Sequence, residues 1–212
     1  MYLPAHFEER RIDVLHAFVR EHPFALLVTA GADGPVANGL PFLLDAGGEA
    51  GLGVLRGHVA RANPVWRDAV DAPSLVVFQG PDGYVSPSFY PAKAEHGKVV
   101  PTWNYAMVQA RGRLRAIDDR EWLRAFVARL TERHESARAA PWAVTDAPPD
   151  YVDTMLRAIV GVEIELTALV GKWKLTQNRT MEDRRGVAHG LEATADERLS
   201  KLARLMRDAG AA

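Results

Sequence analysis

The chain has 212 residues, of which 48% are hydrophobic and 25% are charged, proportions typical of a folded globular protein. Its 26 lysines and arginines nearly balance 27 acidic residues, so nucleic-acid binding would require a local basic patch. The absence of cysteine excludes disulfides, thiolate nucleophiles and cysteine-ligated metals. No signal-peptide pattern and no membrane-length apolar run is present, so we expect a soluble, cytoplasmic protein without a membrane partner.

The first half of the chain has the pattern of short strands joined by tight turns. Apolar runs and turn residues predict strands over residues 24–30, 36–44, 51–57 and 75–79. Helices are predicted over residues 7–21 and 60–70. Asp33-Gly34 and Asp82-Gly83 are typical of turns. This spacing favours antiparallel hairpins over parallel βαβ units.

The second half begins with a proline-rich segment over residues 86–101, which we interpret as a long, functional loop. Strands are predicted over residues 103–117 and 160–167, and helices follow Asp118-Asp119 and span residues 150–157. Thr180 and Thr194 resemble helix caps of a polar helical tail. The whole order predicts a mainly β, α+β fold: a small closed or partly split antiparallel barrel with peripheral helices.

A polar cluster at the predicted strand-to-helix junction is a candidate anion site. It contains Arg56, His58, Arg61 and Asn63, and free N–H groups at a helix N-terminus favour an anion. In the alternative interpretation, Asn63 caps the helix beside Pro64 and the arginines are solvated. The spacing leaves both interpretations open.

Two blocks that flank the long loop combine aromatic rings with short hydroxyl and amide groups. They are Ser86-Pro87-Ser88-Phe89-Tyr90 and Pro101-Thr102-Trp103-Asn104-Tyr105. A flat heteroaromatic ligand requires this mixture, although a loop anchored by buried aromatic rings would have the same composition. The later segment from Lys172 to Arg179 offers donors for phosphate, sugar or carbonyl oxygens, or is a solvated strand end.

Several other sites are excluded or disfavoured by spacing. Gly51-Leu52-Gly53 does not follow a predicted strand, so it does not fit a dinucleotide fingerprint. The histidines do not have metal-ligand spacing, and no Walker loop or Gly-x-Ser-x-Gly nucleophile is present. We therefore predict neither a metal site nor a particular catalytic residue.

Taken together and in this order, the blocks resemble the PaiB family of FMN-binding negative transcriptional regulators. The resemblance extends from Met1-Tyr2-Leu3-Pro4 to Lys172-Trp173-Lys174-Leu175-Thr176-Gln177-Asn178-Arg179, and Val100-Pro101-Thr102-Trp103-Asn104-Tyr105 is its most specific block. Two positions depart from the family pattern: Phe89 stands where Trp is usual, and Thr176 stands where Ser is usual.

The resemblance implies an FMN-binding split β-barrel over residues 1–175, with a C-terminal helical extension over residues 176–212 packed on it. It also implies a homodimer with FMN at the subunit interface. The positions that would hold the cofactor are Arg56, His58, Arg61, Asn63, Ser86, Ser88, Thr102, Trp103, Asn104, Tyr105, Lys172, Lys174, Gln177 and Asn178.

The implied function is transcriptional repression, which requires a surface for DNA. Candidate surfaces are Arg111, Arg113 and Arg115 on one strand, and Arg179, Arg184 and Arg185 in the tail. The alternative is an FMN-dependent oxidoreductase, such as an NAD(P)H-linked reductase or an oxidase of a small molecule. A third interpretation is a haem protein on the same barrel, with His58 or another histidine as the iron ligand.

Overall fold

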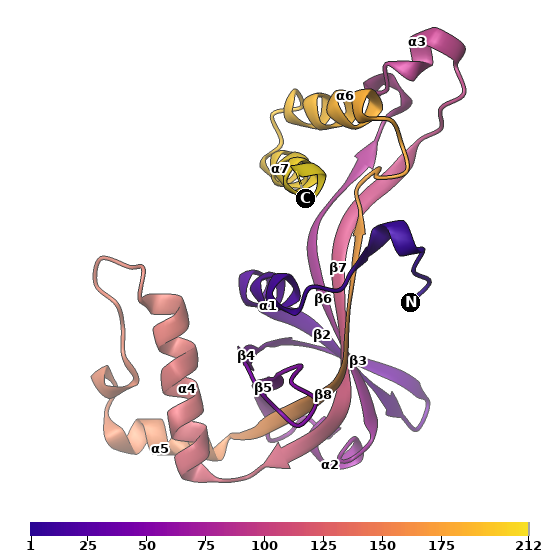
Figure 1. Ribbon diagram of the computed structural model, residues 1–212. Coiled ribbons are helices and arrows are strands. Elements are labelled where there is room, and N and C mark those ends of the chain that lie inside the picture. Colours follow the sequence, from indigo (N-terminus) through magenta and orange to yellow (C-terminus); the bar gives the residue numbers. More distant parts are fainter. Residues whose placement is uncertain (212) are drawn as a thin grey trace. The chain divides into compact units, whose positions relative to one another are not determined.

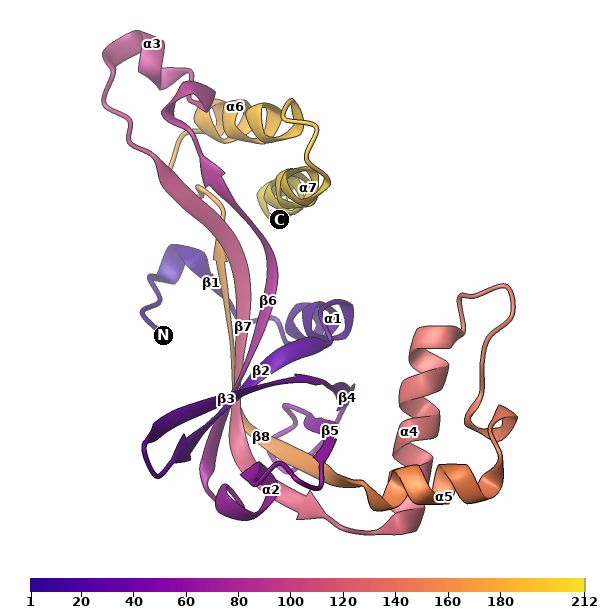
Figure 2. The same cartoon turned by 180° about the vertical axis from the view of Figure 1, so that it is seen from behind.

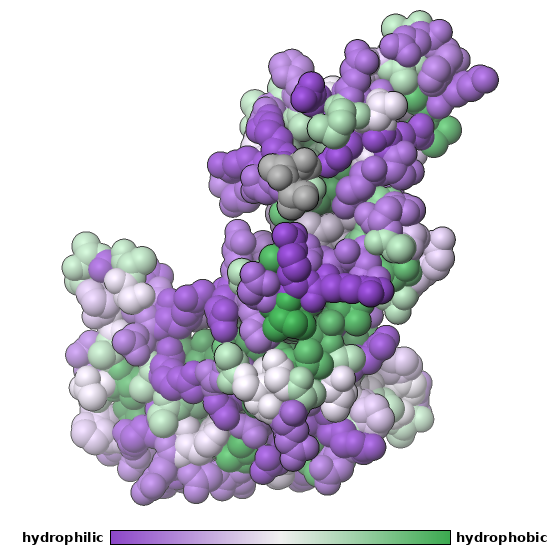
Figure 3. All heavy atoms as spheres, viewed as in Figure 1, coloured by the Kyte–Doolittle hydropathy of each residue, from purple (hydrophilic) through white to green (hydrophobic). Residues whose placement is uncertain are grey.

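The computed structural model of the protein describes residues 1–211, and the chain divides into two compact units. The first unit contains Met1–Phe18, Gln79–Val108 and the chain from Val170 onward; the second contains Val19–Phe78 and Gln109–Leu169. Within residues 1–211, no helix is long and apolar enough to cross a membrane. Hydrophilic side chains cover most of the face shown in Figure 3, with apolar patches between them.

Eight strands form one sheet, and every pairing with a described register is antiparallel. The strands are β1 (Glu8–Glu9), β2 (Phe24–Gly31), β3 (Gly34–Pro41), β4 (Leu43–Asp45), β5 (Val54–Ala60), β6 (Pro73–Val85), β7 (Thr102–Ile117) and β8 (Ile159–Lys174). Their order is β3-β2-β6-β7-β8-β5-β4, and β1 pairs with β8. The long strands β6, β7 and β8 contribute residues to both units (Figure 1).

Helices accompany the strands in both units, as expected for an α+β fold. The α-helices are α1 (Ile12–Glu21), α2 (Val65–Asp68), α3 (Ala92–His96), α4 (Arg120–Glu135), α5 (Pro149–Arg157), α6 (Met181–Glu192) and α7 (Glu197–Ala211). Short 3-10 helices are η1 (Ala5–Phe7), η2 (Pro87–Phe89) and η3 (Val144–Asp146). The predicted caps of two helices are confirmed, because Asp119 accepts a hydrogen bond from Trp122 N and Thr180 accepts one from Asp183 N.

The second unit has an apolar core between its strands and a smaller cluster between two helices. Leu27, Leu55 and Ile164 are fully buried on β2, β5 and β8. Leu123 of α4 packs with Val152 and Leu156 of α5. Burial of these side chains supplies the main driving force for folding of the unit.

The first unit contains the start of β7, the end of β8 and the helix pair α6–α7. Leu191 of α6 and Leu202 of α7 are fully buried. Figures 1 and 2 show α6 lengthwise and α7 end-on, so the two helix axes cross steeply. The connection between the helices, residues 193–196, has a left-handed residue at Ala195.

Several predicted elements differ from the structure in extent or kind: the strand predicted over residues 36–44 divides into β3 and β4, and those predicted over 75–79 and 160–167 extend to Pro73–Val85 and Ile159–Lys174. The first helix starts at Ile12 and not at residue 7, because Glu8 and Glu9 pair with Lys172 and Gly171 of β8. The helix predicted over residues 60–70 shortens to Val65–Asp68, since the preceding residues extend β5 to Ala60. The turn predicted at Asp82-Gly83 lies inside β6, where the missing Cβ of Gly83 leaves room for Leu199 and Leu202 of α7.

Candidate functional site

A cavity of about 170 Å³ lies in the first unit, where β7 begins and β8 ends. We call it the Lys174 cavity. Its lining residues are Phe7, Tyr90, Val100, Thr102, Asn104, Lys174, Thr176, Asn178 and Arg179. Four predicted cofactor residues are therefore brought together: Thr102, Asn104, Lys174 and Asn178.

Strand β7 supplies the floor of the cavity. Alternation along the strand places Thr102 and Asn104 on the same face. Asn104 is fully buried, and its Nδ2 donates a hydrogen bond to Met206 Sδ at 3.6 Å. Its Oδ1 has no hydrogen-bond partner within the described chain. A buried acceptor without a donor costs about 1–3 kcal/mol, so a ligand that donates to this atom would remove that cost.

Two cations line the cavity, and neither has a carboxylate partner among the described residues. Lys174 Nζ donates to Thr102 Oγ1 and to Trp103 O, both at 2.6 Å. Burial, and then the positive charge of Lys172, lower the pKa of Lys174. The guanidinium of Arg179 lies 5.6 Å from the centre of the Tyr90 ring. The cavity therefore suits an anion.

The turn after β8 brings the last donors to the cavity. Thr176 is left-handed, with φ of 63°, which is rare for a β-branched residue. Gln177 closes the turn, since its Oε1 accepts from Leu175 N at 2.7 Å and its Nε2 donates to Trp173 O at 2.5 Å. Asn178 and Arg179 then line the cavity, whereas the polar groups of Gln177 hydrogen-bond within the turn.

The remaining predicted residues of the first unit lie outside this cavity. The Nζ of the buried Lys172 donates to Tyr2 O at 3.0 Å and lies 5.4 Å from the centre of the Tyr105 ring. Trp103 is 51% exposed. The hydroxyl oxygens of Ser86 and Ser88 are 2.7 Å apart, and Ser86 caps η2. These serines have a visible role in the turn.

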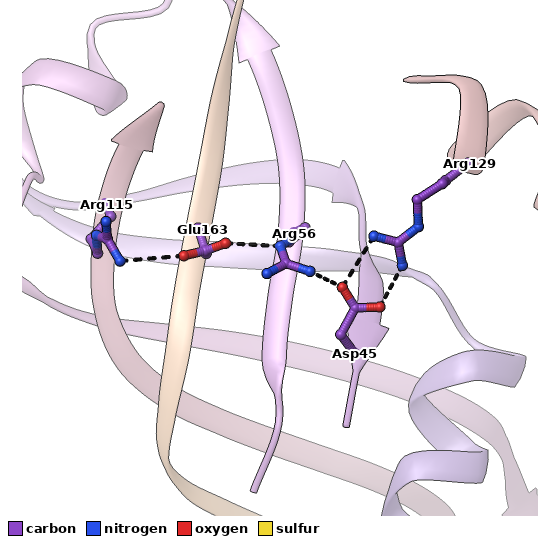
Figure 4. Close-up of polar contacts among 5 residues, drawn as sticks. All are labelled: Asp45, Arg56, Arg115, Arg129 and Glu163. Carbon is purple, nitrogen blue, oxygen red and sulfur yellow. Dashed lines mark hydrogen bonds and ion pairs between the residues drawn. The ribbon is translucent and has the colours of Figure 1, made fainter. Parts of the chain in front are cut away.

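In the second unit, the predicted residue Arg56 belongs to a chain of ion pairs (Figure 4). Its Nε donates to Glu163 Oε2 at 2.8 Å, and its Nη1 donates to Asp45 Oδ2. Arg129 binds the same Asp45, and Arg115 lies 3.4 Å from Glu163. Burial raises the pKa of Asp45, but Arg129 and Arg56 outweigh this effect and hold it below its usual value.

Arg61 and Asn63 also have partners in the second unit. Arg61 Nη1 donates to Asp118 Oδ2 at 2.8 Å, and this contact lowers the pKa of Asp118. Asn63 Oδ1 accepts from Val65 N, the first N–H of α2, at 3.0 Å, so Asn63 satisfies a free donor at the start of this helix. This contact matches the capping interpretation that the sequence left open.

His58 differs from its three predicted neighbours. Its Nδ1 is buried and has no partner within residues 1–211, and burial lowers its pKa. The ring lies edge-on to Phe126, with 5.8 Å between ring centres. Within the same residues, no group of three or more metal-ligating side chains is present. His58 is thus the member of this cluster with unused hydrogen-bonding capacity.

Five lining residues of the Lys174 cavity were not among the predicted cofactor residues. Tyr90, Thr176 and Arg179 stand inside the blocks already singled out in the sequence, so a signal for them existed. Val100 is the first residue of the most specific block of the resemblance, although its apolar side chain carries no chemical signal, and Phe7 lies outside the blocks. No chemical pattern distinguishes Phe7 from an ordinary core position.

Comparison with known proteins identifies the family. Residues 1–168 match the family described as "Putative FMN-binding domain". The chain belongs to this family, and FMN is its cofactor. Protein PAI 2 of Bacillus subtilis, named for protease synthase and sporulation, is 31% identical over 209 residues, covering 98% of this chain and 97% of that protein. This relationship confirms the PaiB resemblance.

Further relatives and solved structures agree with this family and fold. Protein AN0679 of Emericella nidulans is 34% identical, covering 99% of this chain and 98% of that protein. The FAD and heme binding protein of Mycobacterium smegmatis has a TM-score of 0.57 at 18% identity, covering 79% of this chain and 73% of that chain. Protein Rv2991 of Mycobacterium tuberculosis has a TM-score of 0.55 at 16% identity, covering 84% and 92%. The predicted split barrel is confirmed.

Proposed function

We propose that this protein is a PaiB-type regulator of transcription that holds FMN in the Lys174 cavity, completed by a second copy of the chain. One observation carries the placement of the cofactor. Lys174 and Arg179 lack carboxylate partners in the described chain and lie around Asn104, whose buried acceptor is unpaired. Cations without internal partners are available to an external anion.

The chemistry of FMN fits this donor set. Its phosphate and ring carbonyls accept hydrogen bonds, which Lys174, Arg179 and Asn178 can donate. Its ring N–H and ribityl hydroxyls can donate to Asn104 Oδ1, the atom that lacks a partner. When bound, FMN supplies one- and two-electron redox chemistry. The protein's own groups bind the cofactor and bury part of it.

The size of the cavity supports a site shared with a second copy. A volume of about 170 Å³ is below the roughly 300–1,000 Å³ usual for a site that encloses a whole ligand. The chain also has exposed apolar side chains on β2, where Phe24 is 68% and Leu26 is 47% exposed. Such surfaces are typical of protein–protein contacts. A homodimer in which the second copy packs on β2 would cover these side chains.

FMN titration of the cofactor-free protein tests this placement. We expect Lys174→Met to weaken FMN binding by roughly 10- to 100-fold, because hydrogen bonds to charged groups contribute about 1.5–3 kcal/mol. The matched control is Lys201→Met, since Lys201 lies on the exposed face of α7 and pairs with Glu197. Equal affinities of the two variants would disprove the placement. Sedimentation of Phe24→Asp tests the dimer, which we expect to dissociate.

The regulatory role is supported by the relationship to PAI 2 over nearly the full length of both chains. Of the two candidate DNA surfaces, the strand surface is partly engaged, since Arg113 donates to Asp71 O and Arg115 pairs with Glu163. In the tail, Arg184 and Arg185 have no carboxylate partner in the described chain. The tail is therefore the better candidate for phosphate contacts.

DNA binding is measured with a duplex from upstream of the protein's own coding sequence, over a series of salt concentrations. We expect affinity to fall with salt, and Arg184→Gln to reduce the slope of log K against log salt by about 0.9 for one lost phosphate contact. Arg111→Gln is the comparison for the strand surface. Binding that is absent or independent of salt would contradict the regulator. Steady-state NAD(P)H oxidation by the FMN-loaded protein would favour the oxidoreductase.

A further inference from the structure

A second cavity, of about 360 Å³, lies between α6 and α7 in the first unit. We call it the α6–α7 cavity. Its apolar lining comes from Ala188 and Met206, which are both buried, and from Met181, which is half exposed. Methionine side chains adapt to apolar ligands of varied shape, and the volume lies within the usual range for small-molecule sites.

This cavity has a different lining from the proposed FMN site, although the two linings touch where Asn104 Nδ2 donates to Met206 Sδ. The two cavities share no lining residue. All lining residues of the α6–α7 cavity lie on α6 and α7, between Met181 and Arg207, whereas no residue of these two helices lines the Lys174 cavity.

Positive charge surrounds the apolar lining. Arg184, Arg185 and Arg207 all line the cavity, and none of its lining residues is acidic. Arg207 already pairs with Glu192. The side chain of Arg184 hydrogen-bonds only to the weak acceptor Met181 Sδ, at 3.3 Å, and the side chain of Arg185 has no hydrogen bond or ion pair within the described chain. Two guanidinium groups beside the cavity are thus free to bind an anion, and a carboxylate bound here would compete with the DNA phosphate proposed for Arg184.

We propose that the α6–α7 cavity binds a small amphiphilic carboxylate. Its apolar body would lie on Met181 and Met206, and its carboxylate would bind Arg184 and Arg185. A planar guanidinium matches the two oxygens of a carboxylate, and an apolar chain gains free energy when it leaves water for the methionine surface. A neutral alcohol would lack the contact with the guanidinium groups, and acetate would lack the apolar chain.

Methionine methyl NMR of the full chain gives a readout at the site itself. The protein contains five methionines, Met1, Met107, Met155, Met181 and Met206, and only the last two line this cavity. On titration with octanoate, we expect their ¹³C-methyl signals to shift along one saturation curve. The signal of Met155, which is exposed on α5, should stay unchanged. Shifts shared by all five, or no saturation, would overturn the proposal.

Matched variants and ligands separate the two parts of the interaction. Arg185→Gln should weaken octanoate binding by roughly 5- to 10-fold because it removes a charge-assisted contact. The control Arg198→Gln lies on α7 outside the cavity, where Arg198 pairs with Asp196, and should bind as the parent does. Octanol and acetate should each bind at least about tenfold more weakly than octanoate. Equal binding by octanol, or by Arg185→Gln, would overturn the carboxylate assignment.

Repeating the titration with FMN-saturated protein tests whether the two sites are separate. We expect the octanoate curve to be unchanged. A loss of octanoate affinity that grows in proportion to FMN concentration would show a single shared site and would overturn this inference, whereas a change that reaches a limit would show two sites coupled through the Asn104–Met206 contact. Because the titration without FMN needs no bound cofactor, failure of the FMN placement would leave the octanoate result interpretable on its own.

Discussion

The cations of the candidate cofactor site differ between the two units in whether a carboxylate neutralises them. In the second unit, Arg56 contacts Asp45 and Glu163, and Arg61 contacts Asp118. In the first unit, Lys174 and Arg179 line a cavity and have no carboxylate partner among the described residues. The sequence predicts Arg56, Arg61 and Lys174 as cofactor residues. The structure therefore places the cations of one predicted site in two different environments.

This difference separates two uses of a cation. A guanidinium between two carboxylates stabilises the strands that carry them, and binding an external anion would first require those contacts to break. A lysine held only by neutral oxygens pays the cost of desolvation without the gain of an ion pair. Such an arrangement is unfavourable in the free protein and becomes favourable when an anion binds.

Arg179→Glu would place a carboxylate beside Lys174, as carboxylates lie beside Arg56 in the second unit. We expect it to have the largest effect on FMN affinity. The new carboxylate would neutralise Lys174 and repel phosphate, so FMN affinity should fall by roughly 100-fold or more. The measurement is quenching of FMN fluorescence during titration. Arg61→Gln is the control, with an expected change below about 3-fold. A smaller loss for Arg179→Glu than for Arg61→Gln would assign phosphate binding to the second unit.

Arg56→Leu tests the second unit by its stability. Asp45 and Glu163 would each lose the half-buried Arg56 as a partner. Urea unfolding should therefore show a decrease in the free energy of unfolding of about 1–2 kcal/mol, between the values for exposed and buried ion pairs. FMN affinity should change less than about 3-fold. Arg124→Leu is matched, because Arg124 forms one exposed pair with Asp153, and should cost less than about 0.5 kcal/mol. Unchanged stability with lost FMN binding would establish Arg56 as a cofactor ligand.

The sequence predicts those parts of the fold whose pattern is local. The alternation of β7 and the capping residue Asp119 of α4 are both read correctly because each depends on neighbouring positions. The short strand at Glu8–Glu9 is missed, since it forms only by pairing with residues of β8 about 160 positions later. Gly83 is misread as a turn residue because the side chains that pack on it come from α7.

Prediction of the candidate site is likewise limited to information that is local in the sequence. Thr102, Asn104 and Lys174 are found in the sequence because their blocks combine the right chemical groups. The pairing of Arg56 is not visible, since Glu163 is 107 positions away. A paired arginine and an available arginine look alike in sequence, so only the tertiary contacts distinguish them. The roles of individual residues toward FMN stay predictions.

In the second unit, His58 makes the folding stability depend on pH. Burial lowers its pKa below the usual 6.5, so the unfolded chain binds a proton more readily than the folded chain between the two values. Folding stability therefore falls as pH decreases through about 6.5. We expect His58→Gln to reduce this loss in urea unfolding measured from neutral to mildly acidic pH. Parallel pH profiles of the two proteins would contradict a buried, neutral His58.

In the first unit, Lys174 makes FMN affinity depend on pH, and here the loss occurs as pH rises. This is the smallest effect that we expect. Its pKa is lowered from 10.5 by burial and by Lys172, and a bound anion would favour its charged form. FMN affinity should therefore decrease as pH rises through the lowered pKa of Lys174, and should do so earlier than for a lysine with the usual pKa. Lys172→Met removes the second cause, so the midpoint of the decrease should move to higher pH. A midpoint that stays in place would show that Lys172 does not influence the charge of Lys174, and it would leave burial as the sole source of the lowered pKa.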